Sequence, residues 1–165
     1  LGPERADQMV RMGDVERAGV SYSYHSDMPM APGQPLFLMH CGVNRITQSG
    51  RIAGENQRVS REGALRAVTL DAAYSLQMDK EVGSIVPGKL ANFTILADNP
   101  VTCAAAKIKD IAVWGTVHEG RVLPVKKAGG KKTAGVRLPE SFRPVAATPA
   151  PRIPPARPIA AARPL

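Results

Sequence analysis

The chain has 165 residues, a formal net charge of +8 and 44% hydrophobic residues. This length suits a single domain, and no long uncharged apolar run is present, which excludes a membrane-spanning helix. The excess charge lies in residues 124–165, so residues 1–123 are neutral overall and lack the electrostatic signature of a nucleic-acid-binding domain.

The first part of the chain is predicted to be mostly helical. Residues 3–18 carry apolar side chains at near-helical spacing between a proline and a glycine, which favours one helix. Residues 20–24 alternate strictly between apolar and polar side chains, which is the period of a strand. Residues 36–46 are apolar enough for a buried helix, and the polar stretch 47–58 is expected to form a loop.

A further helix is predicted to begin after Ser60, whose hydroxyl suits an N-cap. Its buried stripe would be Ala64, Leu65, Val68 and Ala72. These apolar side chains recur at the spacing of one helical face.

After Gly83 and a Pro87-Gly88 turn, the chain is predicted to form short antiparallel strands. A Glu119-Gly120 turn should join the last two of them. The β-type runs are residues 93–96, 111–114, 116–117 and 122–123.

Residues 124–165 contain nine prolines and few large apolar side chains. Such a segment cannot bury enough surface to offset the entropy of ordering it, so we predict a disordered tail. Phe142 is its one aromatic residue, which gives poor support for base stacking. We expect nucleic acid to bind at most non-specifically through this tail.

Cysteine usage and the amino-terminal sequence bear on the compartment. Cys41 and Cys103 stand far apart and form no C-x-x-C pair, which argues against a disulfide framework and a thiolate zinc site. No signal-peptide pattern follows Leu1, so we expect a cytoplasmic protein with reduced thiols. Because the chain starts with Leu1 rather than Met, we expect a processed chain or part of a longer one.

Asp27 is the first candidate for chemistry, since it ends the predicted strand and precedes a loop rich in Pro and Gly. Catalytic groups of β/α barrels lie at the carboxyl ends of strands. A carboxylate there can bind a metal, act as a general base, or do both. The alternative is that Asp27 only caps the next turn, and spacing alone favours this alternative.

The three histidines are less informative. His25 could line the same site or pack as a strand histidine, His40 fits a core or interface position, and His118 should be exposed. No H-x-H or H-E-x-x-H motif is present, so this chain alone does not supply a complete hydrolytic metal site.

An ordered series of motifs resembles the carboxyl-terminal part of metal-dependent amidohydrolases. The branch it resembles includes N-substituted formamide deformylase-like and N-acyl amino-acid amidohydrolase-like enzymes, over residues 1–123. The motifs are Gly19-Val20, 25–29 (HSDMP), Pro35-Leu36, Asn44-Arg45, 62–69 (EGALRAVT), 72–74 (AAY) and 83–91 (GSIVPGKLA). One departure is Asn92, where the family usually has Asp.

The resemblance implies an α/β fold, a (β/α)8 barrel whose chain ends build a small β-sandwich beside it. Residues 1–83 would then be the carboxyl-terminal fragment of the barrel, 84–123 part of the sandwich, and 124–165 the disordered basic tail. Residues 20–24 would be the last barrel strand. A homo-oligomeric parent protein is compatible with this family.

The resemblance also implies an activity, namely hydrolysis of carbon–nitrogen bonds other than peptide bonds in a small amide or formamide. A divalent metal, expected to be Zn²⁺, would activate the water. Asp27 matches the family's metal-proximal proton acceptor, and His25 would lie at most in the wall of the substrate pocket. The remaining ligands would lie upstream of Leu1, so this chain alone is expected to be inactive.

A second interpretation is a non-catalytic scaffold whose basic tail binds acidic partners such as nucleic acid. The enzyme interpretation is favoured, because the motif series covers residues 1–123. No membrane partner is expected for either.

Overall fold

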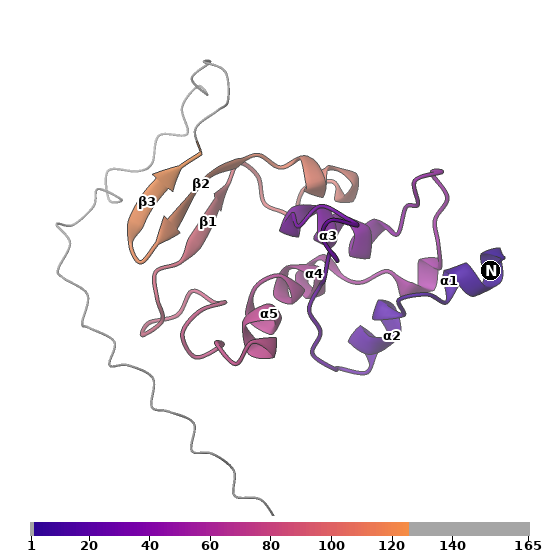
Figure 1. Cartoon of the computed structure of the whole chain (residues 1–165), viewed down its shortest axis with the longest axis horizontal. Helices are drawn as coiled ribbons and strands as arrows, with labels where there is room; N and C mark the ends of the chain where they lie inside the picture. The colour runs from indigo at the N-terminus through magenta and orange to yellow at the C-terminus, as the bar shows by residue number, and fades with distance from the viewer. Residues whose placement is uncertain (1, 126–165) are drawn as a thin grey trace, which may run out of the picture.

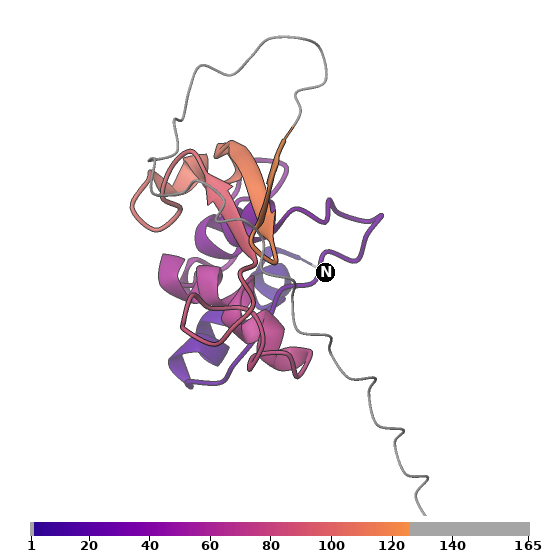
Figure 2. The same ribbon diagram turned by 90° about the vertical axis from the view of Figure 1, so that its left-hand side faces the viewer.

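Helices occupy the first part of the chain and a small antiparallel sheet the last part, in a computed structural model that describes residues 2–125 (Figure 1). The elements are α1 (Pro3–Asp7), α2 (Met12–Arg17), α3 (Pro35–Asn44), the 3-10 turn η1 (Glu55–Gln57), α4 (Arg61–Ala67), α5 (Leu70–Ser75), β1 (Phe93–Leu96), the 3-10 turn η2 (Ala105–Asp110), β2 (Val113–His118) and β3 (Arg121–Pro124). Helices α3, α4 and α5 lie between the sheet and the α1–α2 pair (Figures 1 and 2).

This mixture of helices and a small sheet agrees with the predicted α/β class. The predicted disordered tail began at Pro124, but Pro124 is ordered as the last residue of β3. The rest of that prediction beyond Val125, and the binding of acidic partners by the tail, fall outside the described residues. Within residues 2–125, no helix has both the length and the apolarity needed to cross a bilayer.

The prediction of one helix over residues 3–18 is wrong, because the chain breaks between α1 and α2. Val10 has a left-handed φ of 52°, and its side chain remains 67% exposed, so the apolar spacing does not reflect a buried face. Helix α2 starts anew because the Asp14 amide donates to the buried Gln57 side chain (3.1 Å). That side chain satisfies an amide that a helix start otherwise leaves without an acceptor.

The predicted strand over residues 20–24 is extended but unpaired. Tyr22 and Tyr24 are partly buried while Ser21 and Ser23 are exposed, so the alternation reported two faces over residues 21–24. Val20 departs from it, since its apolar side chain is 57% exposed. No β-bridge to another described segment forms along it, and the strand prediction is therefore wrong for residues 2–125.

The other helical predictions hold with one interruption. Helix α3 forms as expected, residues 47–58 form a loop that contains only η1, and the Ser60 hydroxyl accepts a hydrogen bond from the Gly63 amide (2.9 Å). The helix after Ser60 breaks at Val68-Thr69 into α4 and α5. The Thr69 hydroxyl donates to the Leu65 carbonyl (2.7 Å), a local bond that competes with a regular helix.

The core lies where α3 packs on η2 and on α4. Its buried members come from four segments of the chain and meet in one cluster, formed by Met39, Val59, Ala64 and Ile108. The side-chain amide of the buried Asn44 donates to the Ala105 carbonyl (2.9 Å), which joins the end of α3 to η2. The residues between β1 and β2 are therefore attached to the helices.

The sheet has the order β1-β2-β3 with antiparallel pairing throughout. The predicted runs 111–114 and 116–117 join into the single strand β2, which continues to His118. The Glu119-Gly120 turn forms as predicted, with φ values of 49° and 80° that suit a tight hairpin. Asn92 holds this turn, since its Oδ1 accepts from the Glu119 amide (2.7 Å).

The Asn92 contact predicts a difference between two substitutions. Asn92→Leu removes the acceptor and should lower the free energy of unfolding by about 1 kcal/mol. Asn92→Asp keeps an acceptor oxygen and should have little effect. Urea denaturation of both variants measures this, and equal losses would contradict the assigned role of the hydrogen bond.

The environment of His40 predicts a pH dependence of stability. Burial, together with the nearby Lys109 ammonium, lowers the pKa of His40 in the folded chain. The unfolded chain therefore takes up the proton first, so stability is complete above about pH 6.5 and falls as the pH drops below it.

Urea denaturation between about pH 7 and pH 5 measures this dependence. His40→Gln should flatten it, whereas His118→Gln, at an exposed position on β2, should not. An unchanged slope in His40→Gln would refute the assignment.

Candidate functional site

Asp27 stands at the start of a tight turn that ends the extended segment. Its φ is 53°, in the left-handed region that Asp tolerates better than most residues. The Asp27 carbonyl accepts a hydrogen bond from the Met30 amide (2.7 Å), which closes the turn.

The carboxylate of Asp27 is exposed and has no partner among residues 2–125, neither a hydrogen bond nor an ion pair. The capping alternative would require this carboxylate to accept from an amide of the following turn, and the described structure contains no such bond. An exposed carboxylate without a partner can receive a proton or act as one oxygen ligand of a cation.

His25 is exposed and lies next to Asp27 in space as well as in sequence. Its Nδ1 accepts a hydrogen bond from the backbone amide of Asp27 (3.2 Å). The contact is to the backbone of Asp27, so it leaves the carboxylate free.

Two tyrosines on the opposite face anchor the extended segment. The rings of Tyr22 and Tyr24 meet edge to face, with centroids 5.9 Å apart. Burial raises the pKa of Tyr22 to about 12 and raises that of Tyr24 further, and neither hydroxyl has a partner among the described residues. The Tyr24 hydroxyl occupies the space that a Cβ at Gly42 of α3 would take.

The structure does not bring the three histidines together. His40 is partly buried on α3, where its Nδ1 lies 3.1 Å from the side-chain amide nitrogen of Asn44. His118 is exposed on β2, and both positions agree with the predictions. Among residues 2–125, no three His, Cys, Asp or Glu side chains gather as a metal-binding group.

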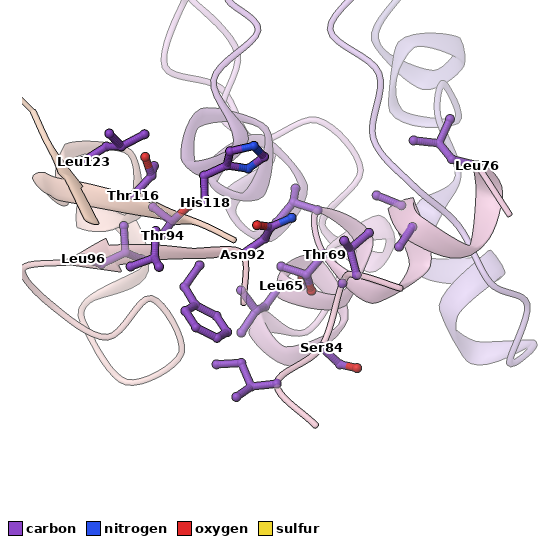
Figure 3. A pocket seen from close by; sticks show the side chains of 18 residues that line it. Leu65, Thr69, Leu76, Ser84, Asn92, Thr94, Leu96, Thr116, His118 and Leu123 are labelled. Atoms are coloured by element: carbon purple, nitrogen blue, oxygen red, sulfur yellow. The ribbon is translucent and has the colours of Figure 1, made fainter. Parts of the chain in front are cut away.

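An apolar groove with a volume of about 910 Å³ lies between the sheet and helices α4 and α5, away from Asp27 (Figure 3). Thr94, Thr116 and Leu123 line it from the strands, and Leu65 of α4 and Thr69, between α4 and α5, line it from the helical side. The sequence did not reveal this groove, because residues from separate parts of the chain form it.

A smaller hollow of about 340 Å³ lies beside the start of the extended segment. Three of its four charged residues are already engaged, and the fourth, Glu62, is exposed. Arg66 pairs with the buried Asp71 (2.8 Å), and the Glu16 carboxylate accepts from the Ser60 amide (2.9 Å).

Comparison with known proteins gives one family match and several relatives. A model of the amidohydrolase family matches residues 1–124. An N-substituted formamide deformylase of Arthrobacter pascens is 34% identical over 112 residues, which cover 68% of this chain and 20% of that protein. The protein LONG AFTER FAR-RED 3 of Arabidopsis thaliana is 40% identical over 101 residues, which cover 60% of this chain and 17% of that protein. The chain thus spans about a fifth of the length of these relatives.

The packing of Tyr24 against α3 predicts two opposite effects. Tyr24→Phe removes a buried hydroxyl without a partner and should raise the free energy of unfolding by about 1 kcal/mol. Gly42→Ala places a methyl group where that hydroxyl lies and should lower the same quantity by about 1–3 kcal/mol.

Urea denaturation of the two single variants and of the double variant measures both effects. Tyr24→Phe should reduce the cost of Gly42→Ala without abolishing it, because the nearest colliding atom is gone while the ring carbon Cζ, 2.8 Å from a Cβ at Gly42, remains. Strict additivity would show that the two residues do not contact each other.

Proposed function

This chain belongs to the amidohydrolase family, a family of hydrolases, and on that premise we propose that it forms the carboxyl-terminal part of a metal-dependent hydrolase. The proposed reaction is hydrolysis of carbon–nitrogen bonds other than peptide bonds. The similarity to an N-substituted formamide deformylase supports a small amide or formamide as substrate. The proposed compartment is the cytoplasm.

The observation that carries the proposal is the free carboxylate of Asp27. It lies at the position of the aspartate that the family resemblance assigns to chemistry, and no described residue pairs with it. A carboxylate in this state can accept the proton of a water molecule as that water attacks a carbonyl carbon.

The metal is part of the proposal, with Zn²⁺ as the expected cation. A bound divalent cation would lower the pKa of water and polarise the substrate carbonyl. The exposed Asp27 carboxylate fits one oxygen ligand of such a site. The other ligands would come from outside residues 2–125, and this chain would be inactive without them.

The extended segment supports the proposed barrel. Residues 20–26 have strand-like alternation but no strand beside them in the described chain. Backbone amides and carbonyls of such a segment are suited to pair with neighbouring strands. As the last strand of a barrel, the segment would place Asp27 at its carboxyl end, where barrel enzymes carry catalytic groups.

The groove supports the proposed second unit. We propose residues 1–83 as the end of the barrel and residues 84–123 as part of the sandwich. The face of the sheet that carries Thr94, Thr116 and Leu123 is open toward the groove and exposed. Further sandwich strands from the longer protein would have an apolar surface to cover there.

The proposed role of Asp27 predicts a large effect in the longer protein that includes the preceding barrel residues. Asp27→Asn keeps the size of the side chain but removes the proton acceptor, so hydrolysis of an N-substituted formamide should fall by about 10²–10⁴-fold. Steady-state kinetics measures the loss.

Asp98→Asn is the matched control, since Asp98 is exposed beyond β1 and is remote from this turn in sequence. Its rate should equal that of the wild type. Full activity of Asp27→Asn would overturn the catalytic assignment.

A further inference from the structure

We infer that His25 is a positioning residue for Asp27, acting through the hydrogen bond from the Asp27 amide to its Nδ1. The inference rests on the proposed function of Asp27 as the proton acceptor. It assigns to His25 a role different from that of a pocket wall residue, because its identified contact is to the backbone that carries the carboxylate.

Two hydrogen bonds hold the backbone of Asp27, one through its amide and one through its carbonyl. The Asp27 amide donates to His25 Nδ1 (3.2 Å), and the Asp27 carbonyl accepts from the Met30 amide (2.7 Å). Together they support a left-handed conformation with φ of 53°. The direction of the Cα–Cβ bond follows from the backbone, so these bonds set the direction in which the carboxylate leaves the chain.

The residues before and after His25 both contact other parts of the chain. Before it, the partly buried Tyr24 packs against α3 at Gly42. After it, Ser26 lies against the returning loop, since a Cβ at Gly33 would be 3.7 Å from the Ser26 hydroxyl oxygen. His25 can therefore act as a fixed acceptor although its own ring is exposed.

The hydrogen bond also determines the tautomer of the neutral His25 ring. A backbone amide is always a donor, so Nδ1 must carry a lone pair, and a neutral ring then carries its proton on Nε2. In this tautomer His25 offers no free lone pair to a cation. It presents instead an N–H donor beside Asp27, which distinguishes a positioning residue from a ligand.

Amide hydrogen exchange measured by NMR on the 165-residue chain tests the contact without any activity. His25→Phe keeps an aromatic ring but has no acceptor, so the Asp27 amide should exchange about three- to tenfold faster. His25→Asn keeps an acceptor, since an Asn Oδ1 bonds the amide two residues ahead in an Asx-turn, and exchange should stay near the wild-type rate. Equal Asp27 exchange rates in the wild type and His25→Phe would overturn the inference.

Kinetics in the longer protein tests the consequence for the carboxylate. In His25→Phe, kcat for an N-substituted formamide should fall about ten- to hundredfold with little change in KM, because a misdirected carboxylate loses transition-state contact. His25→Asn should recover most of that loss.

The outcomes separate the two proposals. An inactive Asp27→Asn with a fully active His25→Phe would overturn the positioning role alone. Full activity of Asp27→Asn would overturn the proposed function, while the exchange experiment would still decide the contact. Loss of activity in His25→Phe with no rescue by His25→Asn would refute positioning through an acceptor atom.

Discussion

The packing of η2 on α3 is the contact on which the described fold depends. Ile108 of η2 is fully buried against Met39 of α3, and the Asn44 side chain ties the two elements through the Ala105 carbonyl. Because η2 lies between β1 and β2 in the chain, this contact joins the sheet to the helices. The Arg61 guanidinium reinforces the connection by donating to two carbonyls of the segment just before η2 (2.7 and 2.8 Å). Charge-assisted bonds of this kind hold irregular backbone that has no ladder partner.

The candidate site depends on the same helix, because Tyr24 packs against the core cluster that contains Met39. Helix α3 accommodates Tyr24 at Gly42, where the missing side chain leaves space for the tyrosine hydroxyl. The tyrosines face inward, and alternation along the extended segment then places His25 and Asp27 on the outward face. A well-packed core thereby fixes the position of an exposed turn. Residues that take no part in the proposed chemistry therefore position this turn.

Features determined by neighbouring residues were predictable from the sequence. The Ser60 cap involves Gly63 only three positions away, and the Glu119-Gly120 turn depends on the positive φ that Gly120 adopts without strain. The break between α1 and α2 was not predictable, since the acceptor for the Asp14 amide belongs to Gln57. The alternation indicated burial correctly over residues 21–24 but not pairing, because a period of two reports the faces of a segment and not its neighbours.

The candidate site, too, was predictable from the sequence only in part. His25 and Asp27 were both visible as candidates, and their spacing of two residues puts their side chains on one face of an extended segment. What the sequence did not reveal was that the backbone turns left-handed at Asp27, which brings its amide to His25 Nδ1. A cap would have engaged the Asp27 carboxylate with the backbone ahead of it. Here the amide of Asp27 is bonded to the side chain behind it, so one residue is held through its backbone while its carboxylate is left without a partner among residues 2–125.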